Sequence, residues 1–355
     1  MKPVIICGGV GTKMWPLSRV SHPKHFLPIF DGKSLFQINY EVLLKKFKPE
    51  DIYIQTTEVQ AKTVFEQEPQ IPRGNCFIEP ELRNTGPSLG FMALKLSQLD
   101  PDEPFFLVQS DDLRDPPEKF LEMIDQCDKL VRRDGRMITG GFRPDYGVMG
   151  VDYMIAGEKA ENTGGVDIYK IAKFVWRSTD ADADSYVKQE TVFLHANHCS
   201  WTPRALLTAY QKFAPAWFAS LEKIRVFLEN DDEARIREVY STMEKGPAEN
   251  VTQHVFPDSY VVSLPFKWVD FGTWESFFKY RKEHGQYLPG DNILEIETKN
   301  CFVQKRDKNF VALVGVEDLF VIDTDDALLI CKNNQSGKVG DIVTALKEKE
   351  KKEYL

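Results

Sequence analysis

Apolar positions along the first 140 residues follow two different periods. Short runs of consecutive apolar residues predict strands, and stretches where apolar residues recur every three or four positions predict amphipathic helices. This alternation predicts crossover connections, and hence an α/β fold with a Rossmann-like, mostly parallel sheet and helices on both faces. The expected strands are Val4–Cys7, Ile52–Gln55, Cys76–Ile78, Phe105–Val108 and Met137–Thr139, and the expected helices are Ser34–Phe47, Glu58–Phe65, Pro87–Leu99 and Pro117–Arg132.

The pattern changes twice further along the chain. Residues 141–280 are mixed and rich in aromatic side chains. After Pro289 the pattern indicates short strands, and a charged helix over Gly340–Lys352 follows them. Pro and Gly interrupt helices and strands, so Pro289-Gly290 predicts a domain boundary. The boundary would separate a catalytic domain, 1–288, from a β-rich module, 289–355, that resembles a small β-helix. The short strands expected in the module are Cys301–Gln304, Phe310–Val314, Leu319–Ile322 and Ala327–Cys331.

Charge and composition narrow the possible partners. The net charge of -9 argues against a nucleic-acid surface or an anionic membrane surface, so a phosphate site must be a local basic pocket. No apolar run approaches the roughly 20 residues of a membrane helix, and the first apolar stretch is too short for a signal peptide. We therefore expect a cytoplasmic protein. Its six cysteines are scattered without a Cys-x-x-Cys pair, which predicts reduced thiols.

A glycine-rich loop follows the first expected strand. Gly8, Gly9 and Gly11 precede Thr12 and Lys13, and glycines at this place let backbone N–H groups approach phosphate oxygens. A Walker loop would end in Gly-Lys-Ser/Thr, and a dinucleotide fingerprint would need a third glycine where Met14 stands. A Rossmann dehydrogenase is therefore a weak alternative, and a plain glycine-rich turn remains a second one.

The loop continues as Pro16-Leu17-Ser18-Arg19 and then Pro23-Lys24-His25-Phe26-Leu27. This segment resembles the signature of the mannose-1-phosphate guanylyltransferases, within the sugar nucleotidyltransferase family: Gly-Gly-x-Gly-Thr-Arg-Leu-Trp-Pro-Leu-Ser-Arg, then Pro-Lys-x-Phe-Leu. The resemblance implies a nucleotidyltransferase fold, nucleotide binding by Gly8, Gly9, Gly11, Thr12 and Lys13, and a catalytic role for Lys13 and Lys24 beside the phosphates. Lys13 stands where the family usually has arginine, so a planar guanidinium that can donate two parallel hydrogen bonds is replaced by a compact ammonium group.

Two acidic residues are candidate metal ligands. Gln109-Ser110-Asp111-Asp112 follows the strand Phe105–Val108, and a carboxylate at a strand end suits Mg²⁺, which often takes only one or two carboxylates. The segment Trp268–Trp274 resembles the family's Trp-Ser-Asp-Val-Gly-Ser-Trp. The resemblance implies that Asp111 and Asp270 share Mg²⁺ and that Ser110 contacts the nucleotide. Asp112 is the alternative to Asp111, and a turn or helix-capping role is the alternative function for Asp111.

The segment Glu79–Pro87 resembles the family's Glu-Pro-x-x-Arg-Asn-Thr-Ala-Pro turn beside the base. The resemblance implies that Arg83, Asn84 and Thr85 bind the nucleotide. Asn84 and Thr85 also make a suitable helix start, with Pro87 in the first turn, and both interpretations can hold together.

The resemblance is weaker on the sugar side. Residues 142–150 loosely resemble a loop that packs on the hexose, which implies a contact by Gly147. Lys173–Ser178 takes the place of a Phe-x-Glu-Lys-Pro motif, whose acid is missing, while Arg177 keeps a positive charge for the sugar phosphate. His195 and Asn197 fall where relatives have Trp-Asn-Ser-Gly, a segment that holds sugar hydroxyls. Ordinary strand and loop roles are an equal alternative here.

Together these resemblances imply an enzyme that transfers GMP from GTP to mannose 1-phosphate with Mg²⁺, giving GDP-mannose and pyrophosphate. The sugar phosphate would attack the α-phosphorus in line. Residues 314–324 and 326–329 resemble the family's C-terminal module, which implies a homodimer. One alternative is the same chemistry with another sugar 1-phosphate, such as a heptose or another hexose, or another NTP. The second is a non-catalytic nucleotide-sugar-binding regulatory homologue.

Overall fold

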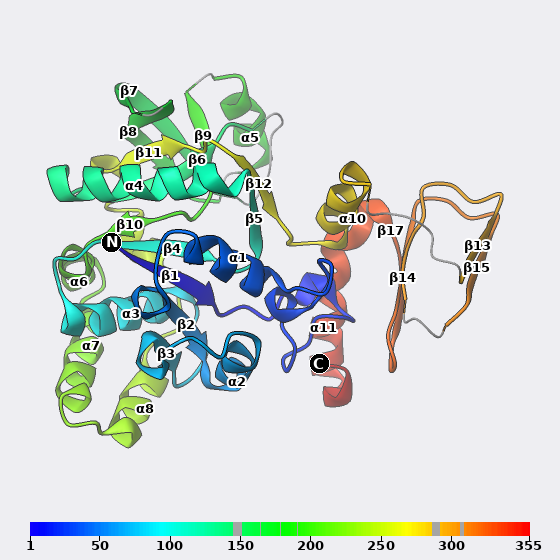
Figure 1. The fold of residues 1–355 in the computed structure, drawn as a ribbon, viewed down its shortest axis with the longest axis horizontal. Coiled ribbons are helices and arrows are strands. Elements are labelled where there is room, and N and C mark those ends of the chain that lie inside the picture. The colour runs from blue at the N-terminus through cyan, green and yellow to red at the C-terminus, as the bar shows by residue number, and fades with distance from the viewer. Residues whose placement is uncertain (145–150, 164, 178, 190, 286–291, 306–308) are drawn as a thin grey trace. The chain divides into compact units, whose positions relative to one another are not determined.

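The computed structural model describes residues 1–144, 151–163, 165–177, 179–189, 191–285, 292–305 and 309–355 (Figure 1). The chain forms two compact units, each made of segments distant in sequence. The first comprises Met1–Gly8, Tyr40–Gln109 and Arg114–Lys267, and the second comprises Gly9–Asn39, Ser110–Leu113 and Trp268–Leu355. The boundary predicted between Leu288 and Pro289 falls outside the described residues and stays a prediction.

The first unit is built around a ten-stranded sheet in the order β11-β8-β7-β9-β6-β10-β4-β1-β2-β3. The strands β3, β2, β1 and β4 pair in parallel, as the sequence predicts. Beyond β4 most pairings are antiparallel, so the sheet is mixed and its parallel character is concentrated at one end. The bounds are β1 Lys2–Cys7, β2 Tyr53–Thr57, β3 Cys76–Glu79, β4 Phe105–Gln109, β6 Ile138–Phe142, β7 Tyr153–Thr163, β8 Val166–Val175, β9 Val192–His195, β10 Ser200–Trp201 and β11 Tyr260–Ser263.

The helices of the first half begin and end close to the predicted bounds. The most amphipathic of them, α4, has a proline at its first position and ends at Gly135, whose φ of 64° suits glycine. The mixed middle section contains three consecutive helices, α6 to α8, whose buried side chains join α3 in one apolar core. The helices are α1 Leu35–Leu44, α2 Glu58–Gln67, α3 Thr85–Leu99, α4 Pro117–Asp134, α5 Asp180–Val187, α6 Pro203–Phe213, α7 Pro215–Leu228, α8 Glu233–Thr242 and α9 Glu249–Thr252.

The second unit joins the glycine-rich loop to the C-terminal module. In the module, β13 pairs in parallel with β15, and β14 pairs in parallel with β16, as successive coils of a β-helix do. The four predicted strands are confirmed, and β13 is additional. The elements are β13 Ile293–Ile296, β14 Phe302–Gln304, β15 Val311–Val314, β16 Leu319–Asp323, β17 Leu328–Lys332, α10 Trp274–Glu283 and α11 Val339–Glu348. A two-stranded ribbon of β5 Asp112–Asp115 and β12 Lys267–Asp270 has residues in both units.

The core of the second unit explains why the segment Gly9–Asn39 shares a unit with the C-terminal segment Trp268–Leu355. Trp15, from the loop, packs in one apolar cluster with Trp274 and with Val339 of α11. The Trp15 indole donates a hydrogen bond to the carbonyl of Tyr354 at 2.8 Å, and the Trp274 indole donates to the carbonyl of Trp15 at 3.0 Å. The C-terminal residues therefore fix the glycine-rich loop directly.

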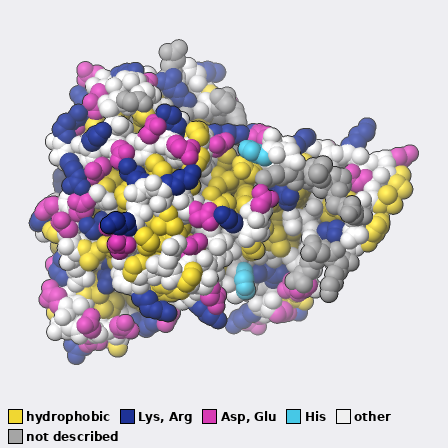
Figure 2. Space-filling view, in the orientation of Figure 1, with side chains coloured by type: hydrophobic (Ala, Val, Ile, Leu, Met, Phe, Trp, Pro, Cys, Tyr) yellow, Lys and Arg dark blue, Asp and Glu magenta, His cyan; other side chains and the backbone are white. Residues whose placement is uncertain are grey.

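Charged side chains of both signs are interspersed over the face shown in Figure 2. No helix among the described residues has both the length and the apolar character needed to cross a membrane. All six cysteines are free, in agreement with the reduced thiols expected from their spacing.

Candidate functional site

Three residues predicted to act together converge in the second unit. The Lys24 ammonium lies 2.6 Å from Asp111 Oδ2 and 3.8 Å from Asp270 Oδ1. It also donates a hydrogen bond to the carbonyl of Phe271 at 3.2 Å. Asp111 and Asp270, 159 positions apart in the numbering, therefore engage one cation.

The pKa values in this cluster are shifted by opposing effects. Burial would lower the pKa of Lys24, but the carboxylates of Asp111 and Asp270 outweigh it and raise that pKa. Loss of water would raise the pKa of Asp111, yet the Lys24 ammonium lowers it below its usual range. The pKa of Asp270 is raised, because desolvation and the negative charge of Asp111 exceed the opposing effect of Lys24. The cluster thus holds one firmly ionised carboxylate beside one that ionises less readily.

The backbone around Asp111 decides which of the two neighbouring acids faces Lys24. The Asn39 side-chain amide donates to the carbonyls of Ser110 and Asp112, at 3.4 and 2.9 Å. The Phe271 amide donates to the Asp111 carbonyl at 3.4 Å. With the backbone held in this way, the Asp111 side chain is 29% exposed and Asp112 is only 3% exposed. Asp111, rather than its alternative Asp112, is the residue paired with Lys24.

The glycine-rich loop approaches Lys24 closely at Gly11. This residue has a φ of 75°, and a β-carbon placed on it would lie 2.5 Å from Lys24 Cγ. The Lys24 amide donates to the Val10 carbonyl at 3.4 Å, and the Ser18 hydroxyl donates to the same carbonyl. Only glycine allows this approach, so Gly11 is required for Lys24 to reach the carboxylates.

The rest of the loop lies beside the same cluster. Thr12 and Lys13 begin a short 3-10 helix, and the side chain of Lys13 is exposed. The Lys13 charge is one of the smaller effects acting on Asp270. Gly340 of α11 faces these residues, since a β-carbon there would lie 3.6 Å from Thr12 Oγ1. Gly9 lies in the same unit, whereas Gly8 ends the first segment of the other unit.

The donor set of the cluster fits a hard divalent cation. Asp111 and Asp270 are carboxylates that already share one positive charge, and Mg²⁺ commonly takes one or two carboxylates with water and substrate phosphates. Within the described ranges, no group of three or more His, Cys, Asp or Glu side chains gathers as a metal site. The geometry therefore suits a site that substrate oxygens complete.

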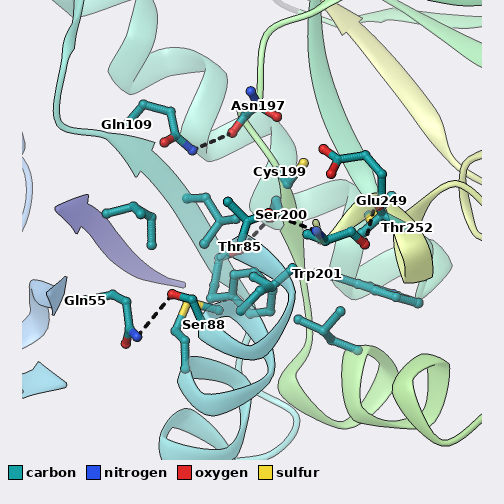
Figure 3. A pocket seen from close by; sticks show the side chains of 18 of the residues that line it. Gln55, Thr85, Ser88, Gln109, Asn197, Cys199, Ser200, Trp201, Glu249 and Thr252 are labelled. Carbon is teal, nitrogen blue, oxygen red and sulfur yellow. Dashed lines mark hydrogen bonds between the residues drawn. The ribbon is translucent and has the colours of Figure 1, made fainter. Parts of the chain in front are cut away.

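A second group of predicted residues, Arg83, Asn84 and Thr85, lies in the first unit, and of these only Thr85 is among the residues that line the pocket shown in Figure 3. Asn84 has a φ of 70° and caps α3, because its side-chain oxygen accepts from the Thr85 amide at 2.8 Å. Thr85 Oγ1 accepts from the Ala248 amide at 2.8 Å, and Thr85 lines the pocket. Arg83 forms an ion pair with Glu81 at 2.8 Å. The helix-start interpretation is confirmed, and nucleotide binding by this turn stays a prediction.

A buried carboxylate supports one wall of this pocket. Glu79 accepts hydrogen bonds from the Ser88 hydroxyl at 2.6 Å and the Tyr240 hydroxyl at 2.7 Å. Burial raises the pKa of Glu79, although these hydrogen bonds and one from Gln55 oppose the rise. The Gln55 amide also donates to Ser88 Oγ at 3.4 Å, and Gln55 and Ser88 both line the pocket (Figure 3). The network holds these polar groups in fixed orientations.

The residues predicted on the sugar side are only partly brought together. His195 and Asn197 line the pocket, and the Asn197 carbonyl accepts from Gln109 at 3.3 Å. His195 Nε2 is 2.9 Å from Thr139 Oγ1, and burial lowers the pKa of His195 to about 4. Arg177 is exposed and is not among the lining residues. Gly147 lies outside the described residues, and the four roles stay predictions.

Sequence reasoning missed several polar residues that line this pocket, among them Gln55, Gln109 and Glu249. Gln55 and Gln109 lie in β2 and β4 near their carboxyl ends, where ligands of parallel sheets bind, so their positions could have marked them. Glu249 begins the short helix α9. Its sequence neighbourhood carries no periodic or motif signal, and only the fold brings it to the pocket.

The family models match most of the chain. The "Nucleotidyl transferase" family model matches residues 2–286, and the "MannoseP isomerase/GMP-like beta-helix domain" model matches residues 291–346. The latter agrees with the paired coils of β13 to β16.

Curated relatives match along almost the whole chain. "Mannose-1-phosphate guanylyltransferase 2" of Escherichia coli O157:H7 is 28% identical over 99% of this chain and 74% of its own length. "Mannose-1-phosphate guanylyltransferase" of Klebsiella pneumoniae is 26% identical over 99% of this chain and 75% of its own length. "Xanthan biosynthesis protein XanB" of Xanthomonas campestris pv. campestris is 24% identical over 97% of this chain and 73% of its own length.

A solved structure shares the fold. The protein described as "mannose-1-phosphate geranyltransferase" from Thermus thermophilus superimposes with a TM-score of 0.82 at 22% identity, covering 98% of this chain and 99% of that one. Because the nucleotidyl transferase model spans well over half of the residues, and because the glycine turn, lysine and paired aspartates that carried the resemblance lie together, the chain belongs to the nucleotidyl transferase family and is a sugar nucleotidyltransferase.

Proposed function

We propose that the protein transfers GMP from GTP to mannose 1-phosphate, forming GDP-mannose and pyrophosphate. The observation that carries the proposal is the convergence of Lys24, Asp111 and Asp270 beside the glycine turn at Gly11. The names of the curated relatives support GTP and mannose 1-phosphate as the substrates.

The reaction joins two anions, so the protein's main task is electrostatic. An oxygen of the sugar phosphate forms a bond to the α-phosphorus of GTP, and the bond from that phosphorus to the bridging oxygen of pyrophosphate breaks in line. The second pKa of a phosphate monoester is near 6, so the attacking group is already largely ionised at neutral pH and needs no general base.

Each residue of the cluster has a proposed task in this step. Lys13 and the amides of the glycine turn hold the departing pyrophosphate. Lys24 reduces the repulsion between the two substrates. Asp111 and Asp270 would hold Mg²⁺, which when bound would neutralise phosphate charge at the reacting centre. In the first unit, Arg83, Asn84 and Thr85 bind the nucleotide, while Arg177, His195 and Asn197 bind the sugar phosphate.

A panel of nucleoside triphosphates and sugar 1-phosphates, scored by pyrophosphate release with Mg²⁺, tests the proposal. We expect the highest kcat/KM for GTP with mannose 1-phosphate and no release without added divalent cation. A clear preference for another sugar 1-phosphate or another NTP would keep the chemistry and overturn the substrate assignment.

The second candidate is a non-catalytic nucleotide-sugar-binding homologue. Two departures from the family pattern favour it: Lys13 in place of arginine, and Trp176 in place of the acid of the Phe-x-Glu-Lys-Pro motif. Binding of GDP-mannose by calorimetry, with no pyrophosphate release at any Mg²⁺ concentration, would establish this alternative.

We also propose that the protein is a cytoplasmic homodimer. Hydrophobic side chains gather over β13 and β15 in Figure 2, and large apolar side chains of the C-terminal module are at least half exposed. They are Leu294, Ile296, Phe310, Val314, Leu328 and Ile330. Exposed apolar groups of this extent favour association with a second copy.

A further inference from the structure

One residue of the pocket has a chemical character that none of its neighbours shares. Among the described residues that line the pocket of Figure 3, Glu249 is the only Asp, Glu, Lys or Arg. The remaining lining is apolar, apart from His195 and a few neutral polar groups such as Gln109 and Asn197. A hexose presents several hydroxyl donors, and an ionised carboxylate is a stronger acceptor for them than a neutral amide.

The backbone holds Glu249 at the pocket wall. The preceding residue, Ala248, donates its amide to Thr85 Oγ1 at 2.8 Å, which ties the start of α9 to the start of α3. In Figure 3 the carboxylate of Glu249 extends toward the side of the pocket that carries Cys199 and Asn197. It therefore extends toward the side of the pocket that carries Asn197, one of the residues predicted to contact the sugar phosphate.

The carboxylate oxygens of Glu249 are available to accept hydrogen bonds from a ligand. Burial raises the pKa of Glu249, and the negative charge of Asp152 adds to this rise. A hydrogen bond from the Glu249 backbone amide and the positive charge of Arg177 both act to lower the pKa. Within the described part of the chain, the Glu249 side chain makes no hydrogen bond or ion pair with another residue. Because a partly desolvated acceptor without a hydrogen bond is unfavourable, a ligand that donates hydrogen bonds to it gains binding free energy.

On the sugar side, this sequence lacks the glutamate of the family's Phe-x-Glu-Lys-Pro motif. Trp176 stands where the family motif has glutamate, is 39% exposed at the end of β8, and is not among the lining residues. The charged neighbours of Glu249, Arg177 and Asp152, flank β8 and β7, whereas the base turn precedes α3.

We propose that Glu249 is a sugar-recognising residue, whose carboxylate accepts hydrogen bonds from the hydroxyls of the hexose phosphate. The inference rests on the proposed function and names a residue that the family signature does not supply. Since the contact involves the hexose alone, Glu249 should affect the binding of ligands that carry the sugar and leave the binding of the nucleotide unchanged.

Calorimetry with GDP and GDP-mannose separates binding of the nucleotide from binding of the sugar. We expect Glu249→Gln to weaken GDP-mannose binding about tenfold, the scale of one charge-assisted hydrogen bond, and to leave GDP binding within twofold of wild type. Turnover should show a raised KM for mannose 1-phosphate and an unchanged KM for GTP. Glu244→Gln, an exposed glutamate five positions earlier, is the matched control and should bind both ligands as wild type does.

Deoxy analogues identify the hydroxyl. Removing one hydroxyl from mannose 1-phosphate should weaken wild-type binding at the position that Glu249 contacts, and the same analogue should show no further loss with Glu249→Ala. Additive losses at all positions would overturn the inference.

The outcomes distinguish this inference from the proposed function. Equal losses for GDP and GDP-mannose would show that Glu249 recognises the nucleotide, and no loss for either would remove it from recognition altogether. Both results overturn the inference and leave the function intact. If wild type binds GDP-mannose without turnover, the proposed reaction fails while the calorimetric comparison still decides the role of Glu249. Binding of neither ligand would overturn both.

Discussion

At the scale of single residues, the most informative feature is Lys24. Its ammonium contacts the carboxylates of Asp111 and Asp270 and the Phe271 carbonyl, so its position depends on two segments that are distant from it in sequence. The family signature identified all three charged residues. The sequence could not show that Lys24 itself bridges the acids, because that contact depends on the left-handed backbone at Gly11 and on burial, which carry no local pattern.

Replacing Asp111 tests the central cluster. Asp111→Ala removes the stronger acid of the pair and leaves Lys24 with Asp270 alone. We expect turnover to fall about 100-fold or more, the scale observed when one electrostatic stabiliser is removed. Asp258→Ala, at an exposed aspartate that pairs with Arg136, is the control and should keep wild-type turnover. Near-normal pyrophosphate release by a folded Asp111→Ala protein would contradict the assignment.

His195 makes stability depend on pH. Burial lowers its pKa to about 4, whereas histidine in an unfolded chain titrates near 6.5. Between these values the unfolded chain binds more protons, so the stabilisation present above pH 6.5 is lost as the pH falls toward 4. We expect the fall in unfolding free energy from pH 7.5 to pH 5 to be roughly 2 kcal/mol smaller in His195→Gln than in wild type, measured by urea titration. An identical fall in both proteins would refute the explanation.

At the scale of elements, the glycine turn and the Lys24 segment behave as one unit. Val10 accepts hydrogen bonds from both the Lys24 amide and the Ser18 hydroxyl, and Gly11 leaves room for the Lys24 side chain. A change in the turn should therefore be transmitted to the carboxylates without touching them.

Gly11→Ala tests this coupling. The new β-carbon meets Lys24 Cγ and an unfavourable positive φ, so we expect a loss of about 1–3 kcal/mol in unfolding free energy and at least a tenfold fall in turnover. Gly337→Ala is the control in the same unit, since a β-carbon there meets nothing within 4 Å. If the alanine at position 11 leaves turnover intact, Lys24 does not depend on this turn.

The elements show where sequence patterns were sufficient. The first four strands were predicted because each is a short run of consecutive apolar residues. The helix Pro117–Arg132 was predicted because it combines a strong helical period with Gly135 beyond its end. The antiparallel half of the sheet was not predicted, since pairing direction depends on contacts between distant strands such as β7 and β9. The three helices α6 to α8 were not resolved within the section described as mixed, although α6 has a helical period as strong as that of α4.

At the scale of the whole molecule, the apolar surface of the C-terminal module predicts association. We expect sedimentation equilibrium to give a dimer, and Val314→Lys with Ile330→Lys to give a monomer that retains its fold, because both side chains are more than half exposed. Val226→Lys, at a similarly exposed valine of α7, should leave the dimer unchanged. A wild-type protein that is monomeric at micromolar concentration would contradict the proposed homodimer.

The hydrogen bond from Trp15 to Tyr354 has a consequence for biosynthesis. A nascent chain emerges from the ribosome with its N-terminal end first, and domains tend to fold as they emerge. The glycine turn is translated before Trp274, Val339 and Tyr354, the residues that hold it in place. Until those residues have been translated, this segment lacks its native partners, so we expect a nascent chain to acquire nucleotide affinity only after Tyr354 has emerged from the ribosome.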